Sequence, residues 1–190
     1  MALKSTVFKA QLAIADVDRS LYADHALTLA RHPSETDERM MMRLLAFALH
    51  VPADDARGAL EMARGLCDTD EPDLWRHDLD GTLLHWIEVG LPDERRQLKA
   101  CGRAARVGVL AYGTSVPLWW AALADRVARC ANLDVWQVDA AASRALATLA
   151  RRTMRLQVTV NDGQVWVGDG ESTVEFAPRR LLAARLGASR

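Results

Sequence analysis

The sequence predicts a mixed α/β protein that folds as one compact domain over residues 1–183, followed by a flexible tail at residues 184–190. Strand-like and helix-like patterns alternate along the chain, and no repeat or linker rich in Pro, Gly or Ser separates them. Residues 83–91 form an apolar run that is typical of a strand buried on both faces. A chain of 190 residues is long enough to bury roughly 70% of its unfolded surface.

Charge and composition narrow the classes of protein to consider. The chain has 24 basic and 25 acidic residues, which argues against a protein that binds nucleic acid through overall positive charge but leaves a local basic patch open. No apolar run approaches the ~18 residues of a membrane span. The three cysteines lie far apart without a CxxC motif, which indicates thiols in a reducing compartment. We therefore expect a cytoplasmic protein without a membrane segment.

The strands are predicted from alternating or continuous apolar patterns. Residues 5–15 and 21–30 alternate with a period of two and are separated by turn residues, which predicts an antiparallel pair. Asp73 begins a short strand, and an Asp-Gly turn leads from there into a central strand over residues 83–90. Further strands are expected at residues 107–112, 133–138, 155–160, 164–167 and 173–176.

The helices are predicted from capping residues and from helical spacing of apolar side chains. The first, over residues 35–50, has Ser34 as its expected N-cap and acidic residues in its first turn. Helical spacing puts Glu38 at the start of the apolar stripe that faces the core, while Arg39 and Arg43 sit more to the side. The other helices are expected at residues 93–105, with Asp93 as N-cap, and at residues 115–129 and 140–150.

One acid interrupts the apolar central strand. Side chains alternate across a strand, so Glu88 shares a face with Leu84 and Trp86. A lone ionised carboxylate on such a face costs several kcal/mol unless another group compensates its charge. Asp73 enters the neighbouring antiparallel strand, and Glu38 begins a helix that could pack on the same sheet. The sequence therefore predicts that these three acids meet.

Carboxylates that are brought together repel one another and favour a bound cation. Their oxygen atoms suit a hard divalent ion, so Glu38, Asp73 and Glu88 are candidate ligands for Mg²⁺ or Mn²⁺, as one or two ions. Such an ion can activate a water molecule and neutralise charge on a transferring phosphoryl group. Lys99 on the next helix could supply a further positive charge, because its compact ammonium is not interchangeable with the arginines around it.

The helix expected at residues 93–105 also carries a basic face. Arg95, Lys99 and Arg103 recur at helical spacing, and Arg96 lies alongside them. This face is the candidate contact for the phosphate backbone of a nucleic acid. The alternative is a solvated basic face without a ligand.

Two sets of residues resemble known families. Pro72-Asp73, followed on the next strand by Glu88-Val89-Gly90, is similar to the motif of the PD-(D/E)XK nucleases, with Gly90 at the motif's lysine position. Longer stretches, which together span most of the chain, resemble the bacterial YaeQ family. They are MALKST, LTLARHPSETDERMMMRLLAFA, RGLCDTDEPDLW, WIEVGLPDERRQLKAC, ANLDVWQVD and RTMRLQVTV.

The resemblance implies a compact variant of the PD-(D/E)XK restriction-endonuclease-like fold with extra strands. In that superfamily the Asp after Pro and the Glu of the next strand bind the metal, which corresponds to Asp73 and Glu88 here. An acid on the preceding helix often joins them, as Glu38 would. Some members recruit a basic residue from the following helix, and Lys99 is then the substitute for the motif lysine. The implied activity is Mg²⁺-dependent hydrolysis of phosphodiester bonds, with these four residues as the catalytic set.

Each candidate also has a structural interpretation. Glu38 is favourable in the first turn of a helix through the helix dipole, and Asp73 could be a surface acid beside a proline. Glu88 could form a buried ion pair with an arginine. The functional alternative to a nuclease is a non-catalytic module that retains the fold and binds nucleic acid or a protein.

Overall fold

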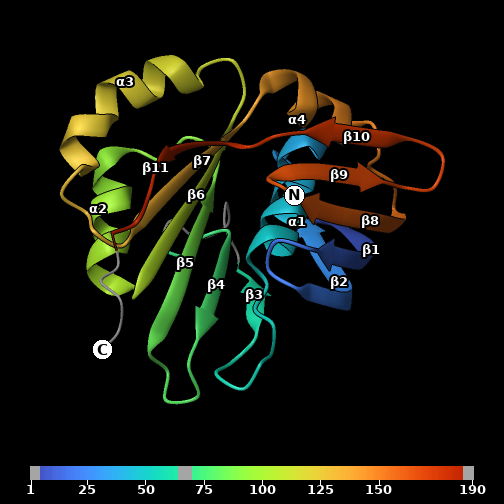
Figure 1. Cartoon of the computed structure of the whole chain (residues 1–190), viewed down its shortest axis with the longest axis horizontal. Coiled ribbons are helices and arrows are strands. Elements are labelled where there is room, and N and C mark those ends of the chain that lie inside the picture. Colours follow the sequence, from blue (N-terminus) through green and yellow to red (C-terminus); the bar gives the residue numbers. More distant parts are fainter. Residues whose placement is uncertain (1–4, 64–69, 186–190) are drawn as a thin grey trace.

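The computed structural model describes residues 5–63 and 70–185, which form two β-sheets with helices around them (Figure 1). In chain order, the elements are β1 (Thr6–Asp16), β2 (Leu21–Arg31), α1 (Asp37–His50), β3 (Leu60–Met62), β4 (Leu74–His77), β5 (Leu83–Val89), α2 (Glu94–Arg103), β6 (Arg106–Tyr112), α3 (Val116–Val127), β7 (Leu133–Val138), α4 (Ala140–Ala147), β8 (Thr153–Asn161), β9 (Gln164–Gly168), β10 (Thr173–Phe176) and β11 (Arg179–Leu182). The predicted mixed α/β class is confirmed.

The first sheet has the strand order β10-β9-β8-β1-β2. β1 and β2 pair antiparallel along their whole length, as their alternating patterns predict. β8, from the far end of the chain, pairs parallel with β1. Alternate residues of β1, including Phe8, Ala10, Leu12 and Ile14, are buried while the residues between them face outward. This sheet therefore buries one face only.

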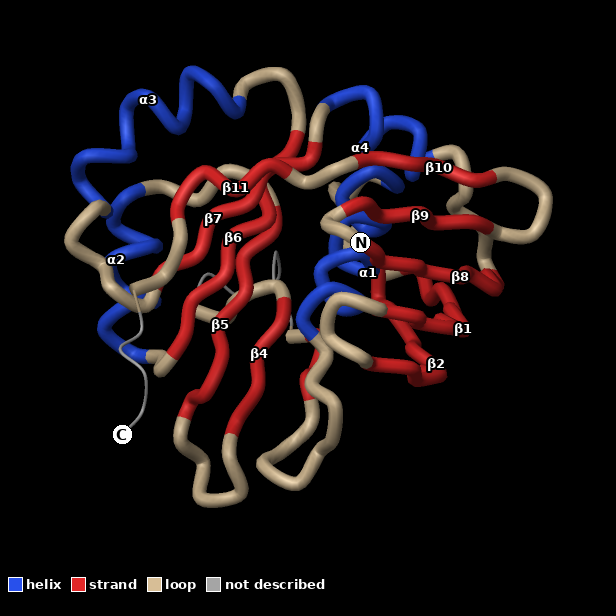
Figure 2. Tube along the Cα trace, viewed as in Figure 1, coloured by secondary structure: helices blue, strands red, loops and turns tan. Residues whose placement is uncertain are grey.

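The second sheet has the strand order β11-β7-β6-β5-β4-β3. β5, β6 and β7 are parallel, and β4 runs antiparallel to β5 as the sequence predicts. In Figures 1 and 2, α2 and α3 lie along one face of this sheet and α1 lies on the other, between the two sheets. This sheet is covered on both faces, which accounts for the continuous apolar run of its central strand.

Two apolar clusters follow from this arrangement. One joins α1 to both sheets and includes Leu12 of the first sheet together with Ile87 and Val89 of β5. The other lies between the second sheet and α2 and α3, and it includes Trp86 of β5. Successive residues of β5 therefore belong to different clusters, so the strand's alternation decides which helix each side chain meets.

Three local features differ from the sequence-based expectations. The N-cap of α1 is Thr36 rather than Ser34, because the Thr36 Oγ1 accepts a hydrogen bond from the Arg39 backbone N–H at 3.1 Å. Ser34 instead contacts the His32 ring at 2.6 Å. The short strands β3 and β11 are additional to the strands expected from the sequence.

The chain's end is partly held by the fold. The backbone N–H of Ala184 donates to Asp134 at 3.1 Å, and that of Arg185 donates to the Ala131 carbonyl at 2.6 Å. The rest of the predicted tail, residues 186–190, lies outside the described residues. Within the part of the chain that is described, no helix combines the length and apolar composition needed to cross a membrane.

Candidate functional site

Asp73 lies directly before β4, beside the carboxyl end of β5. It is only 1% exposed. One carboxylate oxygen accepts a hydrogen bond from the Val89 backbone N–H at 2.7 Å, and the other accepts one from Arg39 Nη2, also at 2.7 Å. Arg43 Nε lies 3.7 Å from the second of these oxygens. Asp73 is therefore a fully buried acid with charged and backbone partners, rather than a surface acid beside a proline.

The two arginines come from α1 and also bind a second buried acid. Glu35, 4% exposed, accepts from Arg39 at 3.1 Å and from Arg43 at 3.2 Å. Burial lowers the pKa of the Arg39 guanidinium, but the carboxylates of Asp73 and Glu35 outweigh this effect and raise it above its usual value. Two acids and two bases thus form a buried, charge-balanced network, which we call the α1 network.

The positions of Arg39 and Arg43 correct the expectation that these residues sit to the side of α1. Arg43 is 5% exposed, and Arg39 reaches across to β4. The expectation assumed that α1 has a solvent face, whereas α1 lies between two sheets (Figure 1). The signal that could have found the network is the spacing of four between Glu35, Arg39 and Arg43, which places an acid and two bases on one face of the helix expected at residues 35–50.

Glu88 is compensated by a different helix. Its Oε1 accepts a hydrogen bond from Trp86 Nε1 at 2.6 Å and another from Arg96 Nε of α2 at 2.7 Å. Burial raises the pKa of the Glu88 carboxyl, Arg96 and Trp86 oppose that rise, and the negative charge of Asp73 adds to it. Glu88 therefore forms the buried ion pair that was the alternative to a metal site, and Arg96 points inward to it instead of joining the exposed basic face.

Strand alternation separates Glu38 from Glu88. Glu88 shares the α2-covered face of β5 with Trp86, whereas α1 packs against the opposite face. Glu38 instead accepts a hydrogen bond from Ser143 Oγ of α4 at 2.6 Å. Leu84, expected beside Glu88, lines a cavity on the α1 side next to an irregularity in the β4–β5 register. Asp73 and Glu88 thus lie on neighbouring strands, but the helix acid does not join them.

These contacts show whether a divalent ion fits among the three acids. Among residues 5–63 and 70–185, no three His, Cys, Asp or Glu side chains lie where they could hold one metal ion. Each carboxylate that the sequence proposed as a ligand already has a hydrogen-bond donor, and for Asp73 and Glu88 that donor is an arginine. The described donor set therefore does not fit the three-carboxylate Mg²⁺ or Mn²⁺ site expected from the resemblance.

Gly90 stands where the resemblance to the PD-(D/E)XK motif would place a lysine. Its φ is +109°, in the left-handed region that residues with a Cβ rarely adopt. Its backbone N–H donates to the Leu110 carbonyl at 3.0 Å, which holds this conformation at the end of β5. A lysine here would strain the backbone. Burial raises the pKa of the nearby Tyr112 hydroxyl to about 12. The positive charge of Arg39 opposes this rise, and the negative charges of Glu38, Asp73 and Glu35 add to it.

The basic face of α2 forms as expected, apart from Arg96. The helix begins after Asp93, whose side chain accepts from the Arg96 backbone N–H at 2.8 Å and confirms the predicted N-cap. Arg95, Lys99 and Arg103 are exposed. Lys99 pairs with Asp70 and does not reach Glu88. We call Arg95, Lys99 and Arg103 the α2 basic face.

Comparisons with known proteins agree over nearly the whole chain. The model of the family described as YaeQ protein matches residues 1–178. Relatives described as uncharacterized protein YaeQ include one from Salmonella typhi, 48% identical over 93% of this chain and 95% of the relative. Another, from Escherichia coli (strain K12), is 46% identical over 92% and 94% of the two chains.

Solved structures show the same architecture. The crystal structure of the YaeQ protein from Xanthomonas axonopodis pv. citri matches with a TM-score of 0.88 and 47% identity, covering 94% of this chain and 99% of that one. The YaeQ protein from Pseudomonas syringae matches with a TM-score of 0.88 and 36% identity, covering 95% and 98% of the two chains. The chain therefore belongs to the YaeQ family.

Proposed function

We propose that this member of the YaeQ family is a non-catalytic nucleic-acid-binding module on a nuclease-like fold, and that the α2 basic face contacts the phosphate backbone. The observation that carries the proposal is the row of exposed cations at Arg95, Lys99 and Arg103. Residues four apart on a helix rise about 6 Å along one face, so the three cations form a linear strip. Such a strip suits a run of phosphates, and it supplies locally the positive charge that the chain lacks overall.

The contacts of these three cations leave them available to bind a ligand. Among the described residues, Arg95 makes no ion pair, and the Arg103 guanidinium lies 5.4 Å from the centre of the Trp86 ring without a bound carboxylate. Within the described part of the chain Lys99 pairs with Asp70 alone. The Asp70 side chain is 75% exposed, and exposed pairs of this kind contribute little to stability. A phosphate group could replace Asp70 at Lys99 at small cost.

We propose a non-catalytic module because arginines already neutralise the charges of the two buried acids. Asp73 is held by Arg39 and the Val89 N–H, and Glu88 by Arg96 and Trp86. An arginine beside a carboxylate neutralises it without a metal. In this arrangement the acids that a nuclease would use for its ion serve instead to position β4, β5 and α2.

A Mg²⁺-dependent phosphodiester hydrolase is the second candidate. The observation in its favour is that Asp73 and Glu88 come from neighbouring strands and that the charge of Asp73 contributes to raising the pKa of Glu88. An ion at this place would require Arg39 and Arg96 to move away from the two acids. The two candidates therefore predict different responses to metal.

Binding is tested by fluorescence anisotropy with labelled single-stranded and duplex DNA and RNA at several salt concentrations. The test variant carries Arg95→Gln, Lys99→Gln and Arg103→Gln. We expect weaker binding by at least tenfold and a salt slope reduced by roughly 2–3, because each phosphate contact contributes about 0.7–0.9 to that slope. The charge-matched control replaces three exposed arginines outside α2, Arg129, Arg144 and Arg155, by glutamine.

Two outcomes would overturn the proposal. If the wild-type protein binds no nucleic acid at low salt, or if test and control variants lose the same affinity, the α2 basic face is not the interface and a protein partner becomes the better hypothesis. Calorimetric titration of Mg²⁺ and Mn²⁺, followed by cleavage assays on the same nucleic acids, tests the second candidate. Metal-dependent cleavage that is lost in Glu88→Gln would establish the hydrolase.

A further inference from the structure

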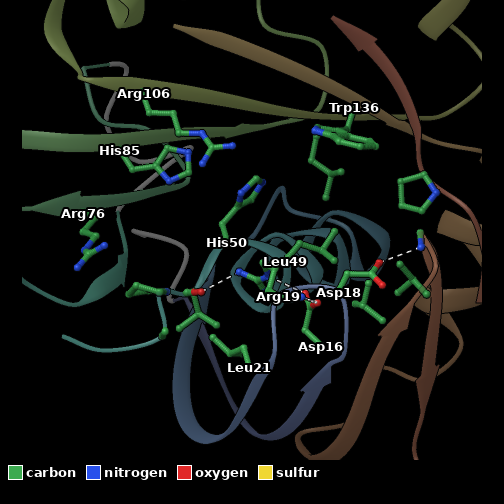
Figure 3. A pocket seen from close by; sticks show the side chains of 18 of the residues that line it. Asp16, Asp18, Arg19, Leu21, Leu49, His50, Arg76, His85, Arg106 and Trp136 are labelled. Atoms are coloured by element: carbon green, nitrogen blue, oxygen red, sulfur yellow. Dashed lines mark hydrogen bonds and ion pairs between the residues drawn. The ribbon is translucent and has the colours of Figure 1, made fainter. Parts of the chain in front are cut away.

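We propose that a cavity between the two sheets binds a small organic anion, with its oxyanion group at Arg76 and Arg106 and its apolar body against Leu49, Leu110 and Trp136. The cavity has a volume of about 530 Å³, within the range of small-molecule sites in proteins. Figure 3 shows Arg76, Arg106 and two histidines grouped at one side of the cavity and Trp136 at the other.

The cavity is separate from the acids and from the α2 basic face. It lies at the C-terminal end of α1, where His50 and Val51 line it, whereas Arg39 and the α1 network are at the N-terminal end. His50 follows Arg39 by eleven positions along the helix, a distance of about 16 Å along the axis. The anion site is therefore independent of the proposed nucleic-acid contact, and each can fail without the other.

The arginine side of the cavity carries excess positive charge. Arg106 and Arg180, each close to half exposed, share the single buried carboxylate of Asp134, which Arg106 contacts at 3.0 Å. Arg76 donates to backbone carbonyls, including that of Gly58 at 2.7 Å, and makes no ion pair within the described ranges. This side has three guanidinium groups and one carboxylate, and even with Asp18 on the opposite side counted, the cavity keeps an excess of one positive charge, which an anionic ligand would balance.

The two acids that line the cavity already have partners. Asp16 forms an ion pair with Arg19 at 2.6 Å. Asp18 accepts hydrogen bonds from the backbone N–H groups of Asp162 at 2.7 Å and Gly163 at 2.9 Å. Both acids therefore face groups of the first sheet and its turns, and neither forms an ion pair with Arg76 or Arg106.

Two histidines add uncharged donors beside the arginines. The rings of His50 and His85 lie edge to face with their centres 5.2 Å apart. Burial lowers the pKa of His50 to about 4, with the charges of Arg106 and Arg19 adding to the effect, and burial together with His50 and Arg106 lowers that of His85. Neither ring forms a hydrogen bond to a described residue, and His85 Nε2 is buried without a partner. A neutral imidazole N–H of His50 is thus free to donate to an oxyanion.

The apolar side of the cavity indicates that the ligand has an apolar body beside its anionic group. Leu49, Leu110 and Trp136 line it, and one face of Trp136 is covered by the Arg180 guanidinium at 4.9 Å from the ring centre. A purely inorganic anion would leave this surface in contact with water. The combination of cations at one side and apolar side chains at the other therefore selects an organic phosphate or carboxylate with an apolar or aromatic body.

The proposal is tested by calorimetric titration with phenyl phosphate, benzoate and the uncharged analogue benzyl alcohol. We expect at least one of the two anions to bind the wild-type protein at submillimolar to millimolar concentration, and benzyl alcohol to bind at least tenfold more weakly. Binding of phenyl phosphate alone assigns a phosphate ester, and binding of benzoate alone assigns a carboxylate. If neither anion binds at 10 mM, a concentration of about ten times the weakest expected Kd, the proposal is overturned.

Variants then locate the bound anion. Arg76→Gln, which breaks no ion pair, is expected to raise the Kd roughly tenfold, since a charge-assisted hydrogen bond is lost. Ala53→Trp at the exposed rim fills the entrance and is expected to abolish binding. Arg129→Gln, an exposed arginine outside the cavity, is the charge-matched control and should bind as the wild type does. Unchanged affinity in both cavity variants would show that the anion binds elsewhere and would refute the site.

Discussion

Replacing Arg96 by methionine tests whether Glu88 is a structural acid. Glu88 is 3% exposed, and Arg96 Nε lies 2.7 Å from its Oε1. Methionine keeps much of the aliphatic length of the arginine, so the substitution removes mainly the charge and the donors. The hydrogen bond from Arg96 Nη2 to the Glu71 carbonyl, 2.6 Å long, is removed as well.

The expected loss of stability follows from the burial of the two partners. Removing one member of a buried ion pair costs about 3–5 kcal/mol, because the other charge is left uncompensated. The Arg96 side chain is 25% exposed, so solvent screens part of the interaction. We therefore expect a loss of about 2–3 kcal/mol at pH 8, which for a protein of this size corresponds to a melting temperature lower by roughly 5–10 °C.

The loss should depend on pH in one direction. Burial raises the pKa of Glu88 in the folded state, and Arg96 opposes that rise, so the variant has a still higher folded pKa. A carboxyl with a raised folded pKa binds its proton more tightly when folded. The stability it contributes is fully present below the unfolded pKa and is lost as pH rises through the folded pKa. The difference in the free energy of unfolding between variant and wild type should therefore be larger at pH 8 than at pH 5.

Urea unfolding followed by tryptophan fluorescence at pH 5 and pH 8 measures both effects. The control is Arg95→Met on the same helix, an exposed residue whose loss should change the free energy of unfolding by less than about 0.5 kcal/mol. The double variant Glu88→Gln, Arg96→Met should recover most of the loss, since the uncompensated charge is gone. The reasoning is refuted if Arg96→Met is as stable as Arg95→Met at pH 8, or if its loss is the same at both values of pH.

Three further predictions concern other parts of the fold. Asp73→Ala removes one of the two carboxylates that Arg39 and Arg43 share and leaves the Val89 backbone N–H without its acceptor, so it should lower the free energy of unfolding by about 3–5 kcal/mol in urea titrations; a loss under 1 kcal/mol would contradict the α1 network. Gly58→Ala places a Cβ 1.9 Å from a backbone carbonyl oxygen at φ +87° and should cost about 2–4 kcal/mol by the same assay, against about 1 kcal/mol for Gly81→Ala, which has φ +86° and nothing within 4 Å; equal losses would exclude the close approach. Burial and the neighbouring cysteine raise the pKa of Cys101 to about 12, so at pH 8 its thiol stays protonated and iodoacetamide should alkylate it far more slowly than a free cysteine peptide, as peptide mass spectrometry can measure; equal rates would show an exposed thiolate.

Local patterns in the sequence were sufficient for most of the secondary structure. The period-two alternation of β1 and β2, the apolar run of β5 and the Asp93 cap of α2 depend on contacts within a few residues, so they can be recognised without the tertiary fold. Local sequence cannot choose between Ser34 and Thr36 as the cap of α1, because both are good capping residues. In the structure the backbone of Thr36 is extended and its side chain accepts from the Arg39 N–H.

The partners of the acids could not be predicted in the same way. Strand alternation indicated correctly that Glu88 lies on the same face as Trp86, but it does not say which helix covers that face. The structure places α2 there, so Glu88 meets Arg96, and it places α1 on the opposite face, so Glu38 is directed to Ser143. The expected three-carboxylate site requires that all three acids point to one side of the sheet.

The sequence by itself therefore determined the α/β class, the order of its main elements and the unusual position of one acid in an apolar strand. It did so because hydrophobic period, turn residues and helix caps act over short separations. Only the tertiary structure decided that arginines compensate Asp73 and Glu88, that α1 has no solvent face, and that Arg76, Arg106 and Trp136 line one cavity. Most of these contacts join residues far apart in the chain, and even the pair of Glu88 and Arg96, eight residues apart, depends on which face of the sheet α2 covers.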